Sequence, residues 1–246
     1  MPARPHLTVK LAQKVTPDDL LSKLRTSYGT SGARGKRVEV VLRDEKRAAL
    51  AVHTAKSLPS PEQAWAWELF EQNMKALYEA SEDGYDPAEK RKELFHADSR
   101  FLVLYSGSAP TPQEKPLGYC IFRFDTEETA SEDDDELCDV AYCYELQVDP
   151  SARRLGAGKT LMDALERLGK ACKMDKTMLT VFKANTEAIA FYKSVGFDTD
   201  EIDPVHYGED VDYCILSKPC TYFSRERLDR KQREICWLPP SAALTS

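Results

Sequence analysis

The chain has 246 residues, enough to bury a full core in one domain, and its 42% hydrophobic and 30% charged residues are ordinary for a soluble protein. Its net charge of -7 disfavours direct nucleic-acid binding, which usually needs a basic face, and suits a basic partner better. The apolar runs are too short to cross a bilayer and no apolar signal segment follows Met1, so we expect no membrane association and no secretion route.

The first part of the chain carries two helix starts and one strand pattern. A hydroxyl, a proline and two acids at Thr16–Asp19 predict a short helix over Leu20–Arg25. Alternating apolar residues predict a strand over Arg37–Arg43. The capping-box pattern Ser60–Gln63, followed by apolar residues at helical spacing, predicts a long helix over Pro61–Ala80.

The rest of the chain alternates between strands and helices. Further helices are predicted from Asp86 to about His96, at about 157–173, at Thr186–Ser194 and, as a charged stretch, at Arg225–Glu234. Strands are predicted at Arg100–Tyr105, Leu117–Phe124, Asp139–Val148, Thr177–Val181 and Val211–Leu216. An acidic loop is predicted over Asp125–Leu137. This order predicts an α/β fold with a mixed sheet covered by helices.

A glycine-rich turn directly after a strand is the strongest chemical signal. Gly156 and Gly158 lack a Cβ, so the backbone can approach a bulky anion there. The first N–H groups of the following helix would point at that anion, and Arg153, Arg154 and Lys159 add positive charge for a pyrophosphate and a ribose phosphate. The spacing differs from the dinucleotide-binding and P-loop motifs. Without further context the glycines could also mark only a tight turn.

That context resembles the coenzyme A motif of the GCN5-related N-acetyltransferases, the GNAT superfamily. Arg153-x-x-Gly156-x-Gly158 follows a strand, and the resemblance extends over about Phe101 to Leu216. It implies a GNAT fold: a mixed central sheet with a splayed strand pair, helices on both faces and an N-terminal helical extension. It also implies acetyl-CoA as co-substrate, bound by Leu146, Gln147, Val148, Arg153, Arg154, Leu155, Gly156, Ala157, Gly158, Lys159 and Asn185.

The resemblance also predicts three segments and leaves two residue roles open. The segments are an N-terminal extension (1–59), an acetyltransferase domain (60–218) and a C-terminal tail (219–246). Asn185 would cap a helix whether or not it contacts the pantetheine arm. Tyr192 either protonates the leaving thiolate or packs beside Phe191.

Glu145 is a carboxylate inside the apolar strand before the glycine turn. An exposed position of a half-buried strand would explain it. The resemblance implies instead that this strand splays from its neighbour at a bulge and that acyl transfer occurs beside Leu146. Partial burial there would raise the pKa of Glu145, so we interpret it as the catalytic base that deprotonates an incoming ammonium.

Several segments more narrowly resemble the NatD type of N-alpha-acetyltransferase: Trp65–Glu79, Phe122–Asp125, Tyr142–Glu145 and Met178–Lys183. That family acetylates the α-amine of the histones whose mature N-terminus reads Ser-Gly-Arg-Gly-Lys. The resemblance makes Glu145 the essential glutamate and implies that the peptide contacts Tyr78, Asp125, Thr126, Glu127, Tyr144, Thr180 and Tyr213. The tyrosines could also be pocket lining without substrate contact.

Two departures from the NatD pattern occur. Asp83-Gly84-Tyr85 stands where some relatives have Trp-Gly-Trp, and an acidic insert ends in Asp133–Glu136. Such an insert is usually a solvated loop, although it could also help to steer a basic tail.

We therefore expect a monomeric enzyme of the cytoplasm and nucleus that acetylates histone N-terminal tails. The alternatives are a GNAT enzyme acting on lysine side chains or polyamines, and a non-catalytic acetyl-CoA-binding regulator. A histone-tail reader without catalysis would not need the coenzyme motif. The four histidines and seven cysteines show no ligand spacing, so we predict no metal site and no disulfide framework.

Overall fold

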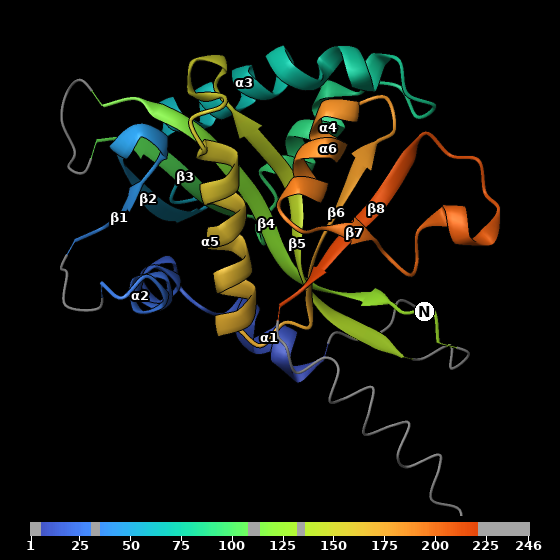
Figure 1. Ribbon diagram of the computed structural model, residues 1–246, viewed down its shortest axis with the longest axis horizontal. Coiled ribbons are helices and arrows are strands. Elements are labelled where there is room, and N and C mark those ends of the chain that lie inside the picture. Colours follow the sequence, from blue (N-terminus) through green and yellow to red (C-terminus); the bar gives the residue numbers. More distant parts are fainter. Residues whose placement is uncertain (1–5, 31–34, 108–113, 132–135, 221–246) are drawn as a thin grey trace, which may run out of the picture.

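The computed structural model describes residues 6–30, 35–107, 114–131 and 136–220 (Figure 1). The helices are α1 (Leu7–Gln13), α2 (Pro17–Ser27), α3 (Ser60–Glu79), α4 (Pro87–Leu94), α5 (Ala157–Ala171) and α6 (Thr186–Ser194). The strands are β1 (Val38–Val41), β2 (Arg47–Thr54), β3 (Arg100–Ser106), β4 (Pro116–Glu128), β5 (Leu137–Val148), β6 (Lys176–Phe182), β7 (Asp198–Thr199) and β8 (Tyr213–Pro219). Short 3-10 turns occupy Arg43–Glu45, Pro150–Ala152 and Pro204–Tyr207.

The strands form one 8-stranded mixed sheet in the order β1-β2-β3-β4-β5-β6-β8-β7. β5 and β6 run parallel, and the other pairs of the described strands are antiparallel. A parallel pair needs a crossover, which α5 provides. The predicted α/β fold with a mixed sheet is confirmed. The segment 1–59 adds β1 and β2 to the same sheet, and the three-segment division of the chain stays a prediction.

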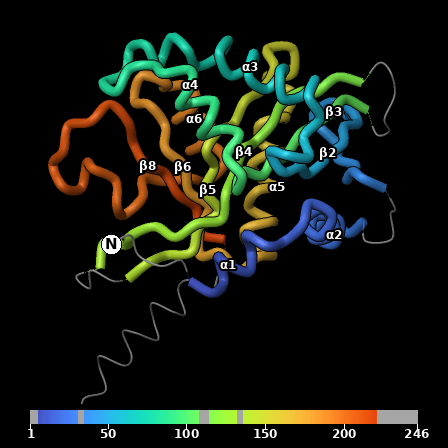
Figure 2. Tube along the Cα trace, turned by 180° about the vertical axis from the view of Figure 1, so that it is seen from behind, coloured from blue at the N-terminus to red at the C-terminus, as the bar shows by residue number. Residues whose placement is uncertain are grey.

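Helices cover both faces of the sheet (Figures 1 and 2). α1, α2, α5 and α6 pack into one apolar core, and α3 and α4 pack into a second core on the opposite face. β3 shows how the sequence serves both: Leu102 and Leu104 join the first core, whereas Phe101 and Val103 join the second. A strand covered on both faces therefore reads as a continuous apolar run.

Among the described helices, α2, α4 and α6 begin with a side-chain cap, whereas α1, α3 and α5 do not. The N–H of Asp19 donates to Thr16 Oγ1 at 3.2 Å at the start of α2, as predicted. The capping box predicted at Ser60 is wrong, because the N-cap of α3 is Pro59 and no side chain caps it. Ser60 is already helical, and Gln63 Nε2 donates instead to the carbonyl of Leu58, which precedes the helix, at 2.7 Å.

The acidic loop predicted over Asp125–Leu137 is shorter than expected. β4 continues to Glu128. Its last four residues pair with the start of β5, from Asp125↔Val140 to Glu128↔Leu137. Cross-strand pairing therefore outweighs the low strand propensity of the acidic residues. The helix α1 and the strands β2 and β7 were not predicted from the sequence. The predicted stretch Arg225–Glu234 and residues 132–135 of the acidic insert lie outside the described residues.

Candidate active site

A β-bulge in β5 changes which face its side chains present. The register with β4 shifts between Ile121 and Phe122, so that Tyr144 is an extra residue on β5. Cys143 belongs to the core beneath α5, whereas Tyr144 packs against the core beneath α3 and the next residue, Glu145, reaches a lysine of α4. The bulge thus directs two consecutive side chains to one face, which unbroken alternation forbids.

β5 and β6 diverge at the same level. Their parallel pairing ends at Cys143↔Leu179, although β5 continues to Val148 and β6 to Phe182. Over this stretch β6 stays paired with β8, and β5 stays paired with β4. One edge of β5 therefore faces a crevice between the two strands. The predicted splayed strand pair is confirmed.

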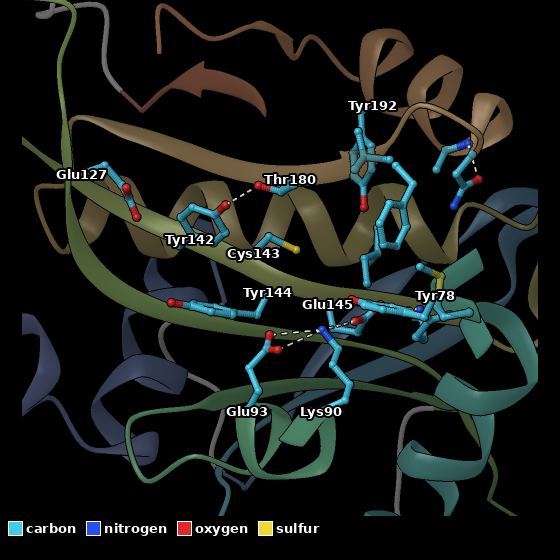
Figure 3. Close-up of a pocket in the computed structure, with 17 residues that line it drawn as sticks. Tyr78, Lys90, Glu93, Glu127, Tyr142, Cys143, Tyr144, Glu145, Thr180 and Tyr192 are labelled. Atoms are coloured by element: carbon cyan, nitrogen blue, oxygen red, sulfur yellow. Dashed lines mark hydrogen bonds and ion pairs between the residues drawn. The ribbon is translucent and has the colours of Figure 1, made fainter. Parts of the chain in front are cut away.

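A pocket of about 370 Å³ lies in this crevice (Figure 3). Residues of α3, α4, β4, β5, β6 and α6 line it. Those predicted as site residues are Tyr78, Glu127, Tyr144, Glu145, Leu146, Gln147, Thr180 and Asn185, and Tyr192 lines it as well. The structure thus brings together, from six elements, most of the residues expected around the acetyl group and the acceptor.

Glu145 is the buried acid of this pocket, with 7% of its surface exposed. Its Oε1 accepts a hydrogen bond from Gln147 Nε2 at 2.6 Å, and its Oε2 lies 3.7 Å from the ammonium of Lys90. Burial raises the pKa of Glu145, while Lys90 and Gln147 oppose that rise by stabilising the charged form. The alternative of a solvent-exposed strand position is therefore wrong, and the carboxylate is a stronger base than an exposed glutamate.

The glycine turn stands at the far end of β5. α5 begins at Ala157, and its N-cap Gly156 has φ 90°, a left-handed conformation that favours glycine. A Cβ added to Gly158 would lie 3.2 Å from a ring atom of Phe191 on α6, so a larger residue here would require that ring to shift. The first N–H groups of α5 have no intrahelical acceptor and can bind an anion. The turn therefore fits the pyrophosphate of a coenzyme.

Comparison with known proteins identifies the family. The model of the acetyltransferase (GNAT) family matches residues 64–197 of this chain. The chain belongs to the GNAT family. GNAT enzymes use acetyl-CoA as acyl donor, and this chain is an acetyltransferase.

Two solved structures agree on the GNAT fold. The GNAT domain of S. lividans PAT is 16% identical, with 74% of this chain and 96% of that chain covered and a TM-score of 0.51. Arabidopsis thaliana NAA60, in complex with a bisubstrate analogue, is 14% identical, with coverages of 69% and 98% and a TM-score of 0.50. Nourseothricin acetyltransferase is 21% identical, with a TM-score of 0.37, and the match covers 50% of this chain and 66% of that one.

The remaining predicted coenzyme residues surround the turn of this GNAT domain. Arg154, Leu155 and Lys159 belong to the turn and first helical residues, and Val148 packs against the core beneath α5. The Arg153 guanidinium contacts α3 through a 2.7 Å hydrogen bond to Asn73 Oδ1. Their contacts with acetyl-CoA stay predictions.

Two residues of α6 face the pocket. Asn185 caps the helix, with its Oδ1 accepting from the N–H of Ala188 at 3.2 Å, and also lines the pocket, so both interpretations of this residue remain open. Tyr192 packs 5.2 Å from Phe191, centroid to centroid, and its hydroxyl points from α6 toward β5 (Figure 3). Burial raises the pKa of Tyr192 well above its usual range, so the phenol is protonated.

Aromatic rings wall the acceptor side of the GNAT pocket. The rings of Tyr142 and Tyr144 lie 5.0 Å apart, and the hydroxyl of Tyr142 is 2.6 Å from Thr180 Oγ1. Tyr78 packs edge-on against Phe182 at 4.9 Å. Burial and the nearby carboxylate of Glu145 raise the pKa of Tyr78 to about 12, so its phenol is neutral. Tyr142 was not predicted as a pocket residue, because it lies within an apolar strand run.

Lys90 is a second pocket residue that the sequence analysis missed. Its side chain, from α4, places the ammonium 3.1 Å from Glu93 Oε1 and 4.8 Å from the ring centroid of Tyr78 (Figure 3). Burial alone lowers the pKa of Lys90, but the negative charges around it, Glu145 and Glu93 among them, hold the pKa above its usual range. Nothing in the charged sequence of α4 distinguishes this buried lysine from the exposed Lys92.

Three predicted peptide-contact residues do not line the pocket. Asp125 and Thr126 lie in β4, where the N–H of Thr126 donates to Asp125 Oδ1, and Tyr213 pairs with Phe182 across the β6–β8 ladder. Asp125 is still close enough to raise the pKa of Glu127, after the larger effect of burial. The contact of these three residues with a peptide stays a prediction.

In the described part of the chain, no group of three His, Cys, Asp or Glu side chains could hold a metal ion. None of the helices in these ranges is long and apolar enough to span a bilayer.

Proposed function

We propose that the chain is an N-alpha-acetyltransferase that acetylates the N-terminal serine of histone tails beginning Ser-Gly-Arg-Gly, as NatD-type enzymes do. The observation that carries the proposal is the position of Glu145, a buried carboxylate where β5 and β6 diverge, with an aromatic and acidic pocket beside it. Such a pocket suits a small cationic group at the end of a basic chain.

The site supplies a base on one side and an acid on the other. Acetyl-CoA provides an acetyl thioester. The acceptor ammonium gives one proton to Glu145 and becomes a neutral amine, which forms the new N–C bond as the C–S bond breaks. Tyr192 protonates the departing sulfur and regains a proton from the acceptor nitrogen, while Glu145 releases its own proton to water. One acetamide, one thiol and one proton result.

The charge of the pocket favours a basic peptide. Glu93 and Glu127 line it and Asp125 lies nearby, whereas Lys90 is the basic side chain among the described lining residues. The whole chain carries -7, which steers cations toward it. We expect the tyrosine rings that line the pocket to favour a small first residue.

Matched peptides test the proposal. A Ser-Gly-Arg-Gly-Lys peptide with a free α-amine should be acetylated, and the same peptide with a blocked α-amine but free lysines should not. Equal reaction of the two would identify a lysine acetyltransferase. Reaction of spermidine alone would identify a polyamine acetyltransferase, and binding of acetyl-CoA without any transfer would identify a regulator.

Glu145→Gln tests the base. The rate of transfer should fall about 10²- to 10⁴-fold while acetyl-CoA binding persists, because the amide keeps the shape of the side chain and cannot accept the proton. The exposed Glu209→Gln is the matched control and should leave turnover unchanged. Turnover of Glu145→Gln equal to that of the parent across pH would leave Glu145 with a structural role only.

The cellular setting belongs to the same proposal. A monomer that acetylates histone tails would work in the cytoplasm and nucleus. Cell fractionation and light scattering measure these two properties directly.

A further inference from the structure

A chain of three hydrogen bonds joins the glycine turn to Glu145. The Arg153 guanidinium donates through Nη2 to Asn73 Oδ1 at 2.7 Å. Asn73 Nδ2 donates to Gln147 Oε1 at 2.7 Å, and Gln147 Nε2 donates to Glu145 Oε1 at 2.6 Å. The chain passes from the turn after β5 to α3 and returns to β5. Its two amide side chains have no role in the reaction as described above.

The two ends fix the direction of both amides. A guanidinium has only donors, and an ionised carboxylate has only acceptors. Asn73 must therefore turn its oxygen to Arg153 and its nitrogen onward, and Gln147 must do the same toward Glu145. Reversing either amide would place a donor against a donor on one side of it and an acceptor against an acceptor on the other. Each hydrogen bond thus supports the orientation of the next.

We propose that Asn73 and Gln147 are positioning residues for acetyl transfer: with Arg153 they form a relay that fixes Oε1 of Glu145 and leaves Oε2 to take the proton from the acceptor amine. This inference rests on the proposed role of Glu145 as base. Gln147 is only 3% exposed, so water does not replace its hydrogen bond to the carboxylate. The relay also ties the base to the turn expected to bind the coenzyme phosphates.

Other titratable groups also face Glu145. They are Lys90 and Glu93 from α4, Tyr78 from α3, Tyr119 and Cys120 from β4, and Tyr192 from α6. Burial raises the pKa of each of the phenols and of the thiol, so these groups stay neutral. Changing Gln147 removes none of these groups, and a shift in the titration of Glu145 then reports the loss of the relay.

The test combines Gln147→Met and Asn73→Leu, which keep side-chain size and remove the hydrogen bonds. The carboxyl of Glu145 is titrated by carbon NMR in glutamate-labelled protein and assigned with Glu145→Gln. Its midpoint should rise in Gln147→Met and rise less in Asn73→Leu. At neutral pH the kcat of Gln147→Met should fall about tenfold or more, as expected for a lost hydrogen bond to a charged group, and should recover at higher pH.

The double variant distinguishes a relay from two independent structural contacts. If the hydrogen bonds act in series, adding Asn73→Leu to Gln147→Met should change neither the titration nor kcat further. If the two contacts are independent, the effects of the two substitutions should add. Gln63→Met, on the same helix as Asn73 but bonded to the carbonyl of Leu58, is the matched control and should leave the titration unchanged.

Additive effects, or an unshifted titration in Gln147→Met, would overturn the relay. If Gln147→Met does not fold, Asn73→Leu decides the question alone, because Asn73 is only half-buried. A parent protein that acetylates no amine would refute the proposed function, while the titration would still test the relay.

Discussion

Lys90→Met removes the buried cation from between Glu93 and Glu145. Methionine keeps the apolar stem of the side chain and removes only the ammonium. The carboxylate of Glu145 then stays buried without its ion pair, and the charge of Glu93 still acts on it. The ionised form of Glu145 becomes less favourable, so its pKa should rise further above the usual range.

The size of the effect follows from the geometry of the ion pair. Lys90 Nζ and Glu145 Oε2 lie 3.7 Å apart, which corresponds to an attraction of about 4 kcal/mol at an effective dielectric constant of about 20. Lys90 also pays a desolvation penalty that the variant no longer carries. Removing one partner of a buried pair commonly costs about 3–5 kcal/mol, so we expect a loss of about 3 kcal/mol in the free energy of unfolding at alkaline pH.

The pH dependence of this loss has a defined sign. The pKa of Glu145 is raised in the folded state, so folding favours its protonated form, and that contribution to stability is lost as pH rises through the folded pKa. At acid pH Glu145 is neutral in both states, and the missing cation matters least. The difference between parent and Lys90→Met should therefore grow with pH, and the rising limb of the pH–rate profile should move to higher pH.

Urea unfolding between about pH 5 and about pH 9, with rate profiles over the same range, measures both effects. Lys92→Met is the matched control, because Lys92 lies on the same helix, pairs with Glu89 at 3.0 Å and is 75% exposed at its side chain. It should stay within about 0.5 kcal/mol of the parent. Equal stability of the two variants, with an unmoved rate profile in Lys90→Met, would refute the reasoning.

Three further results are expected. Gly156→Val should weaken acetyl-CoA binding in calorimetry, since a β-branched residue is strained at φ 90° and blocks approach of the phosphates; unchanged affinity would contradict the coenzyme assignment. Gly118→Ala should lower the free energy of unfolding by about 1–3 kcal/mol, because its Cβ would lie 2.7 Å from the carbonyl oxygen of Gln147. A denaturation midpoint equal to that of the parent would show that the β5 backbone shifts at little cost. Raising the salt concentration should increase the KM of a basic peptide but not of an uncharged one, as charge pairing near the surface is screened over about 10 Å at 0.1 M; equal effects on both would exclude electrostatic steering.

Patterns of hydrophobicity and capping predicted most of the fold. Thr186–Ser194 is predicted with the bounds that α6 has, because its cap and its apolar face are both local signals. β2 was not predicted, because both of its faces are buried and its residues Ala48–Val52 show no alternation of apolar and polar side chains. The extension of β4 to Glu128 depends on a partner strand, which no local pattern reveals.

Some residues of the candidate site could also be predicted from local sequence patterns, whereas others could not. The glycine turn is readable because its backbone geometry demands particular residues at fixed spacing. Lys90 and Glu93 were not predicted, because their place in the pocket depends on how α4 packs across the sheet. The burial of Glu145 depends on the bulge at Tyr144, and sequence alternation alone would place these neighbours on opposite faces.

The bulged strand also constrains how this domain can diversify. The proposed base, the strand edge expected to meet the thioester and the turn expected to bind the phosphates follow one another along β5 and the segment after it, so one inserted or deleted residue in β5 would displace all of them together. The acceptor side includes Tyr142 and Tyr144 of β5, but it also draws on α3, α4, β4 and β6, where side chains can change without moving β5. Selection can therefore exchange the acceptor while the acyl donor stays the same, and changes in length belong at the tip of the β4–β5 hairpin.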